Sequence, residues 1–182
     1  RFALDADGFW QVHPGAADTL VAAVMEGLRP RPGETALDLY AGVGLFSAFL
    51  ASVVGPSGSV LAVESDRRAA QHAAENLEAT GWASVLCARV DKALPGLSSP
   101  ADIVVLDPPR AGANKRVVEP IAALGPRVVA YVACDPAALA RDVAYFGECG
   151  YELASLRAFD LFPMTHHVEC VALLAKSGSD LR

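Results

Sequence analysis

Short apolar runs alternate with longer amphipathic stretches along almost the whole 182-residue chain, and this alternation restricts the possible folds more than any other feature. Runs rich in Val, Leu and Ala suit strands that are buried on both faces, whereas apolar residues spaced three and four positions apart suit helices. The pattern predicts strands at 35–40, 60–63, 84–90, 102–106, 128–133, 152–161 and 167–174, and helices at 15–28, 45–54, 66–80, 115–124 and 136–148.

This order of elements predicts an α/β fold of the Rossmann-like type, with a seven-stranded, mostly parallel sheet, helices on both faces and an antiparallel edge strand. The length suits a single domain, which we expect to span residues 1–176, with residues 177–182 as a flexible tail. No apolar run reaches the roughly 18 residues that a membrane span needs, so no membrane association is expected.

Composition and charge restrict the compartment, the metal sites and the partners expected for this domain. The four cysteines are widely spaced without a CxxC pair, which suits reduced thiols in the cytoplasm better than disulfides or zinc ligands. The adjacent His166 and His167 would point to opposite faces of a strand, so no metal site is expected. The net charge of −6 argues against this domain holding nucleic acid by itself. Because the chain begins with Arg1, we expect a C-terminal domain whose N-terminal portion is absent.

A glycine turn follows the first predicted strand, in the segment Asp38-Leu39-Tyr40-Ala41-Gly42-Val43-Gly44. Ligands of such sheets bind beyond the carboxyl ends of the strands, where glycines let the backbone approach them. The second strand ends in Glu64, whose carboxylate could accept both ribose hydroxyls of an adenosine. We therefore expect a nucleoside cofactor, although a tight turn with a solvated Glu is the structural alternative. NAD stays possible, since Ser47 could complete a dinucleotide motif.

The fourth predicted strand ends in Asp107-Pro108-Pro109-Arg110. Two prolines make the backbone after the acidic residue rigid, so that the acidic side chain can be held facing a reacting group. A dehydrogenase has no need of such a motif. Asp107 could instead cap the turn, and Arg110 could pair either with a phosphate or with a nearby acid.

A thiol and a carboxylate are expected at the same rim of the sheet. Cys134 follows the fifth strand, at the entry of a helix whose amides partly stabilise a thiolate, and Glu169 lies in the last strand. The structural alternatives are a buried small cysteine and a solvated Glu. This pair suits methylation of carbon 5 of a pyrimidine, because thiolate addition at carbon 6 makes carbon 5 nucleophilic and a base must then remove its proton.

At these residues the sequence resembles the RNA uracil-5-methyltransferase family, whose members modify tRNA or rRNA. The resemblance covers nearly the whole chain, through motifs at 9–12, 38–44, 107–112, 134–142 and 162–169. It implies the C-terminal catalytic domain of such an enzyme, with S-adenosyl-L-methionine as cofactor and RNA as partner. It also implies an N-terminal RNA-binding region, often an oligonucleotide-binding barrel, which would explain the acidic charge of this domain.

The resemblance also implies roles for single residues. Cys134 would be the nucleophile that forms a covalent adduct at carbon 6 of the uridine, and Glu169 would be the base. Contacts to S-adenosyl-L-methionine are implied for Gln11, Tyr40, Glu64 and Asp107. To these the glycine turn adds Asp38, Gly42 and Gly44, and we take Arg110 and His167 as candidate substrate contacts.

The chain departs from the family pattern at three places. The family usually has Asn where this chain has His13, and Ser and Asn where Ala133 and Asp135 flank the cysteine. We expect the Asp135 charge to oppose thiolate formation, unless its carboxylate caps the following helix. The third strand also lacks a clear Gly-Asp pair, which leaves Asp91 as the candidate for the acid on the adenine side.

Three rival functions stay open. A cytosine-5 RNA methyltransferase would place a second cysteine in the proline motif, where this chain has none. An amino-group methyltransferase would carry an aromatic residue in place of Arg110. A catalytically impaired, cofactor-binding RNA-processing module finds its support in the altered neighbours of Cys134.

Overall fold

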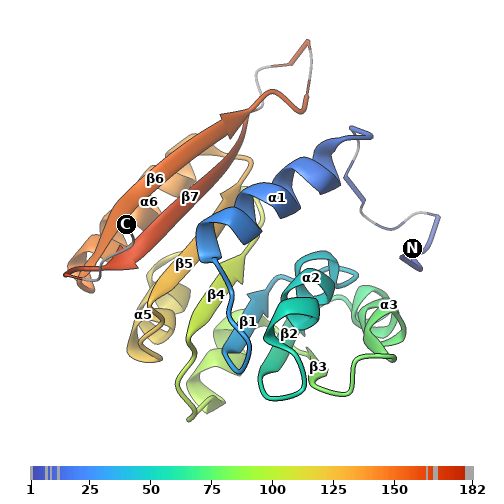
Figure 1. Cartoon of the computed structure of the whole chain (residues 1–182). Coiled ribbons are helices and arrows are strands. Elements are labelled where there is room, and N and C mark those ends of the chain that lie inside the picture. The colour runs from blue at the N-terminus through green and yellow to red at the C-terminus, as the bar shows by residue number, and fades with distance from the viewer. Residues whose placement is uncertain are drawn as a thin grey trace.

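A computed structural model describes residues 2–6, 8, 10–11, 13–162, 164–165 and 168–178 (Figure 1). The strands are β1 (Thr35–Leu39), β2 (Ser59–Glu64), β3 (Ala83–Cys87), β4 (Ile103–Leu106), β5 (Val128–Ala133), β6 (Tyr151–Phe159) and β7 (Glu169–Lys176). The helices are α1 (Ala16–Leu28), α2 (Leu45–Val54), α3 (Arg67–Leu77), α4 (Val90–Ala93), α5 (Lys115–Ala123) and α6 (Pro136–Glu148), with a 3-10 turn η1 (Leu94–Gly96).

The strands form one sheet in the order β3-β2-β1-β4-β5-β7-β6. The first five pair in parallel, and β7 runs antiparallel to both β5 and β6. This confirms the Rossmann-like, seven-stranded and mostly parallel sheet. One detail differs from the expectation: the antiparallel strand β7 lies one position in from the edge, and the edge strand is β6. After α6 the chain returns through β6 parallel to β5, and β7 then fills the gap between them (Figure 1).

Helices cover both faces of the sheet. α1 and α2 pack on one face and α4, α5 and α6 on the other, through two separate clusters of buried apolar side chains. Every residue of β4 and β5 is buried, which explains why these strands are continuous apolar runs rather than alternating ones. The carboxyl ends of β4 and β5 therefore lie at an edge of the sheet that the helices on both faces hold rigid.

Several predicted boundaries are wrong. The strand expected over 84–90 ends at Cys87, and Val90 begins the short helix α4, where its buried side chain joins the core. The helix expected to reach residue 80 ends at Leu77, and the last two strands are β6 and β7 rather than 152–161 and 167–174. Residues 179–182 of the expected tail lie outside the described residues. Among the helices that the structure describes, none is both long and apolar enough for a membrane span.

Candidate active site

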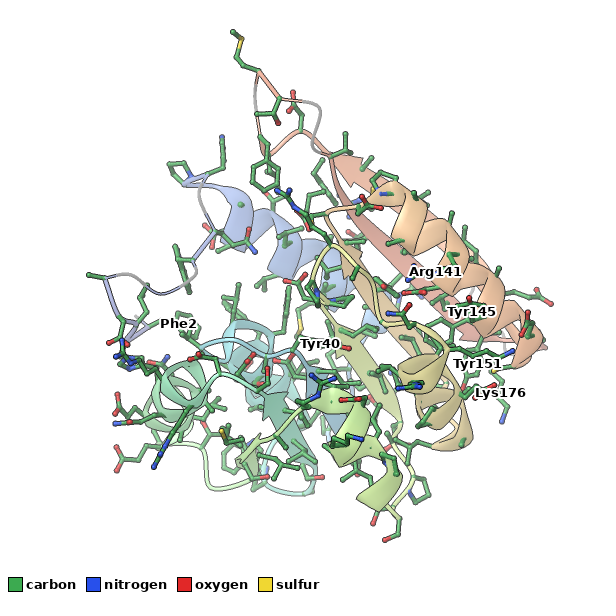
Figure 2. All side chains as sticks on the ribbon, turned by 180° about the vertical axis from the view of Figure 1, so that it is seen from behind. Phe2, Tyr40, Arg141, Tyr145, Tyr151 and Lys176 are labelled. Carbon is green, nitrogen blue, oxygen red and sulfur yellow. The ribbon has the colours of Figure 1, made fainter. Side chains whose placement is uncertain are left out.

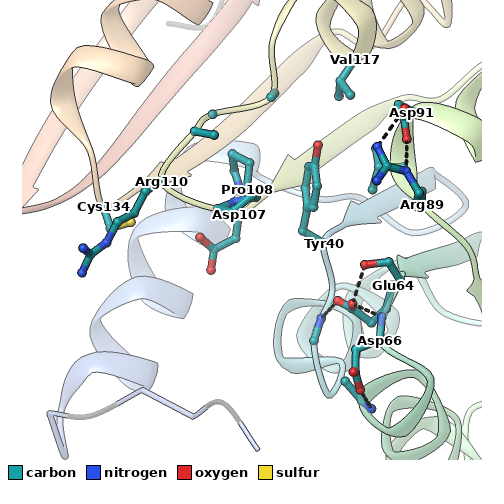
Figure 3. Close-up of a pocket in the computed structure, with 18 of the residues that line it drawn as sticks. Tyr40, Glu64, Asp66, Arg89, Asp91, Asp107, Pro108, Arg110, Val117 and Cys134 are labelled. Atoms are coloured by element: carbon teal, nitrogen blue, oxygen red, sulfur yellow. Dashed lines mark hydrogen bonds and ion pairs between the residues drawn. The ribbon is translucent and has the colours of Figure 1, made fainter.

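A cavity of about 1530 Å³ lies at the carboxyl ends of the central strands (Figure 3). Ligand sites commonly measure roughly 300–1,000 Å³, so this one has room for a cofactor and a second molecule together. The predicted site residues that line it are Gln11, Tyr40, Gly42, Glu64, Asp107, Arg110, Cys134 and Glu169. The predicted substrate contact His167 lies outside the described residues.

The Glu64 carboxylate is fixed at one end of the cavity. Its two oxygens accept hydrogen bonds from the backbone N–H groups of Gly42, at 2.9 Å, and Asp66, at 2.7 Å (Figure 3). The Ser65 hydroxyl donates a third hydrogen bond, at 3.4 Å, and a carboxylate has about four acceptor positions, so capacity for a ribose hydroxyl is left. Gly42 has a φ of 55°, and a Cβ there would meet no atom within 4 Å. The turn therefore leaves open space beside an oriented acceptor, which fits the ribose of a nucleoside cofactor.

Two of the residues predicted to bind the cofactor lie behind the cavity rather than in it. Asp38 is fully buried, and its Oδ2 accepts hydrogen bonds from the backbone N–H (2.8 Å) and the hydroxyl (2.6 Å) of Ser47. Burial raises the pKa of Asp38 to about 6. Gly44 has a φ of 87°, and a Cβ there would approach Ala73 at 3.5 Å. The apolar core lies directly beneath the glycine turn. Asp38 and Gly44 therefore shape that turn and the start of α2 rather than the surface of the cavity.

Tyr40 and the Arg89–Asp91 ion pair form another part of the cavity lining. Tyr40 directly follows β1 and has a φ of 63°, a conformation that costs a non-glycine residue roughly 1–3 kcal/mol and is often found at functional sites. Burial raises the pKa of Tyr40 to about 12, so its hydroxyl stays protonated. The Arg89 guanidinium donates to both oxygens of Asp91, at 3.0 and 3.2 Å (Figure 3). Asp91, the candidate for the adenine-side acid, lines the cavity.

Sequence reasoning missed Arg89 as a lining residue, since the segment around it was expected to be strand. It also missed the contribution of α3. His72 lines the cavity and hydrogen-bonds Asp5 at 3.1 Å and Glu75 at 3.1 Å. Asn76 exchanges hydrogen bonds with the backbone of Ala3, at 2.7 and 3.0 Å, which holds the N-terminal segment beside α3. Polar residues on an exposed helix face gave no sign of this contact.

Strand register brings Cys134 and Glu169 together. β5 and β7 are antiparallel, and their last pair is Ala133 opposite Cys170. Cys134 directly follows Ala133 and Glu169 directly precedes Cys170, so the two residues flank that last pair at the end of β5 and the start of β7. Both side chains line the same cavity. The sequence prediction that a thiol and a carboxylate meet at one rim is thus supported by the register.

The thiol sits among acidic groups. Burial raises the pKa of Cys134, and the charges of Glu169 and Asp107 raise it further, whereas the Arg110 guanidinium opposes them. Arg110 lies beside Cys134 in Figure 3. Burial also raises the pKa of Glu169 to about 7 and, together with the charges of Glu169 and Asp38, that of Asp107 to about 8.

The structure supports the second of the two expectations for Asp135, that its carboxylate caps the following helix. Its Oδ1 accepts a hydrogen bond from the backbone N–H of Ala138 at 2.7 Å, so the side chain caps α6. The charge that acts against the thiolate comes from Glu169 and Asp107, which share the cavity with Cys134. Helix capping therefore accounts for an Asp next to the cysteine.

The sheet order defines a Rossmann-like fold, and the glycine turn with its oriented carboxylate, together with a thiol and a carboxylate in the same cavity, is the arrangement expected of a methyltransferase domain. Residues 97–177, which include Asp107, Cys134 and Glu169, match the family model of tRNA (uracil-5-)-methyltransferases. The resemblance to RNA uracil-5-methyltransferases that the sequence motifs indicated is thereby confirmed. Residues 14–100, which hold the glycine turn and Glu64 but neither Cys134 nor Glu169, match the model of protein-L-isoaspartate(D-aspartate) O-methyltransferases.

Individual relatives and a solved structure show the same similarity to RNA methyltransferases. An uncharacterized RNA methyltransferase of Streptomyces avermitilis is 56% identical over 99% of this chain and 42% of its own length. One from Bifidobacterium longum is 43% identical over 96% of this chain and 42% of its own length. The crystal structure of Pyrococcus abyssi tRNA (uracil-54, C5)-methyltransferase in complex with S-adenosyl-L-homocysteine superposes with a TM-score of 0.81 at 33% identity, over 96% of this chain and 42% of that one. The chain thus spans about two fifths of the length of these relatives.

Proposed function

We propose that this protein is an RNA (uracil-5-)-methyltransferase, which transfers a methyl group from S-adenosyl-L-methionine to carbon 5 of a uridine in tRNA or rRNA. The observation that carries the proposal is that Cys134, directly after β5, and Glu169, at the start of the neighbouring β7, line one cavity together with Glu64. The similarity to RNA methyltransferases supports RNA as the substrate, and the four free cysteines fit a cytoplasmic protein.

Cofactor and substrate would occupy different ends of the cavity. Glu64 would accept the ribose hydroxyls, and Gln11 and Tyr40, which line the same cavity, would also contact the cofactor. Asp107 stands between Tyr40 and Cys134 (Figure 3). When bound, S-adenosyl-L-methionine supplies an electrophilic methyl group. Arg110 lies at the exposed margin beside Cys134, where its charge suits a phosphate or a pyrimidine oxygen.

The chemistry then follows from the side chains of Cys134 and Glu169. The Cys134 thiolate adds to carbon 6 of the uracil ring, and the electron pair of the 5,6 double bond moves into an enolate. Carbon 5 of that enolate takes the methyl group. Glu169 accepts the carbon 5 proton, the double bond re-forms, and the carbon–sulfur bond breaks to release the thiolate. Each step uses a group that lines the cavity.

The pH dependence of methylation follows from the raised pKa values. Glu169 acts as a base only when it is deprotonated, and its pKa is raised to about 7. Cys134 acts only as a thiolate, and its pKa is also raised. We therefore expect kcat/KM for RNA to increase from pH 6 to pH 8, by at least about tenfold per unit below pH 7. Initial rates at saturating cofactor measure this profile, and a flat profile between pH 6 and pH 7 contradicts these assignments.

The cap role of Asp135 predicts a mild variant. Asp135→Asn keeps an oxygen that can accept from the Ala138 N–H, so methylation should stay within about tenfold of wild type. Asp135→Ala removes the cap and should cost about 1 kcal/mol of unfolding free energy. Methyl-transfer rates and urea unfolding of both variants measure this. A complete loss of activity in Asp135→Asn would mean that the charge takes part in catalysis.

Covalent trapping tests the proposal. The protein is incubated with S-adenosyl-L-methionine and RNA that contains 5-fluorouridine, and a second reaction uses RNA with 5-fluorocytidine. Fluorine at carbon 5 cannot be removed as a proton, so a uracil-5-methyltransferase stays bound to the first RNA through denaturing electrophoresis. Trapping by fluorocytidine RNA alone supports the cytosine-5 alternative. Absence of any adduct, with cofactor binding intact, supports a non-catalytic module.

A further inference from the structure

Asp142 is a fully buried carboxylate in the second turn of α6, outside the cavity. Its Oδ2 accepts hydrogen bonds from the backbone N–H groups of Ala113, at 2.6 Å, and Asn114, at 3.2 Å, and from the Tyr131 hydroxyl, at 2.7 Å. Burial raises the pKa of Tyr131 above its ordinary value, which keeps that hydroxyl a donor. One carboxylate oxygen thus joins the loop after β4 to α6 and β5.

The other carboxylate oxygen extends the same connection. Arg141, labelled on α6 in Figure 2, donates to Asp142 Oδ1 through Nε at 3.0 Å and through Nη2 at 2.8 Å, and Nη2 also donates to the carbonyl of Ala111 at 2.8 Å. Gly112 lies against this pair with a φ of 75°. A Cβ there would come within 2.6 Å of both side chains, so the loop can approach this closely only with glycine.

These contacts tie the two segments that carry the reactive groups. The loop of residues 107–114 begins with Asp107 and carries Arg110, while Cys134 precedes the first turn of α6. From these hydrogen bonds we infer that Asp142 is a positioning residue. It fastens this loop to α6 and thereby holds the Arg110 guanidinium beside the Cys134 sulfur. The inference deepens the proposed function and rests on it for the role of Cys134.

The electrostatics of the thiol give this geometry a measurable consequence. Among the charged side chains that the structure describes around Cys134, Glu169 from β7 and Asp107 from the end of β4 oppose the thiolate, and Arg110 from the loop favours it. If the loop detaches from α6, the cation moves away while Glu169 stays in place on β7. The thiol then becomes harder to ionise.

Alkylation of Cys134 measures this without RNA or cofactor. The intact protein is treated with iodoacetamide between pH 6 and pH 10, and mass spectrometry of peptides separates Cys134 from the other three cysteines. In Asp142→Asn the midpoint of the Cys134 profile should rise by about half a unit to one unit, so that the rate at pH 7.5 falls about three- to tenfold. The midpoint reports ionisation, whereas a change in access alters only the plateau.

Paired variants separate positioning from a purely structural role. Arg110→Ala should shift the midpoint as much as Asp142→Asn, and the double variant should shift it no further. Arg141→Gln changes a side chain that is 39% exposed and should shift the midpoint in the same direction, which keeps the test available if Asp142→Asn fails to fold. An unchanged midpoint in folded Asp142→Asn and Arg141→Gln, or additive shifts in the double variant, overturns the inference. Neither result depends on whether RNA is methylated.

Discussion

Replacing Cys134 by Ala is expected to lower methyl transfer to RNA by about 10⁴-fold or more, because the uracil ring then has no thiolate to activate carbon 5. The loss should appear in kcat, since Glu64, the proposed contact for the cofactor, lies away from Cys134 in the same cavity (Figure 3). Transfer of a labelled methyl group from S-adenosyl-L-methionine measures the rate, and calorimetry measures cofactor binding, which should be unchanged.

Cys149 provides a matched control for this loss. It follows the other end of α6 and is partly buried like Cys134, but it does not line the cavity. Cys149→Ala should keep methyl transfer within about threefold of wild type, as expected of a partly exposed site away from the chemistry. Equal losses in both variants would mean that the effect comes from disturbing α6, and a Cys134→Ala variant that still methylates would exclude the thiol adduct.

Replacing Glu169 by Gln should produce the opposite signature, an accumulation of covalent protein–RNA complex with ordinary uridine. Addition at carbon 6 and methyl transfer do not need the base, but release of the thiolate does. Turnover should fall by about 10²- to 10⁴-fold. Denaturing electrophoresis of protein with labelled RNA measures the complex, and the exposed Glu152 on neighbouring β6 supplies the control substitution Glu152→Gln. Fast turnover by Glu169→Gln would assign the proton transfer to another group.

Glu169→Gln should also change the stability of the folded protein in a pH-dependent way. Because the folded-state pKa of Glu169 is raised from its ordinary 4.5 to about 7, its ionisation stabilises the unfolded state. That penalty is absent below about pH 4.5 and grows as the pH rises to 7. Glu169→Gln should therefore melt at a higher temperature than wild type at pH 8, and the difference should shrink toward pH 5.

Much of this architecture was predictable because strand ends in a parallel sheet share one rim. That rule placed Gly42, Glu64, Asp107 and Cys134, which lie at or just after the ends of β1, β2, β4 and β5, at one cavity. Tyr40 was predicted from the family resemblance. The rule fails for Asp38, since it cannot distinguish a side chain that faces the cavity from one that turns back to bind Ser47. Periodicity also could not detect α4, a helix of only four residues whose first residue, Val90, continues the apolar pattern of the preceding strand.

Long-range polar contacts were beyond sequence reasoning for a different reason. Asp142 looked like a polar residue on a helix, and only the packing of α6 against the loop after β4 makes it a buried acceptor of five hydrogen bonds. The position of β7 was similarly open, because a strand pair at the end of the chain can add to a sheet in either order. That order decides the site, since the pairing of β7 with β5 brings Glu169, at the start of β7, to the end of β5 that Cys134 follows.

The central claim is that the Cys134 sulfur attacks the same ring from which Glu169 takes a proton. Mass spectrometric mapping of the complex formed with 5-fluorouridine RNA and S-adenosyl-L-methionine tests it most directly. We predict a single modified peptide, which contains Cys134 and carries the fluorinated nucleotide with one added methyl group. A nucleotide attached at Cys87, Cys149 or Cys170, or methylated RNA with no attachment to any cysteine, would contradict it.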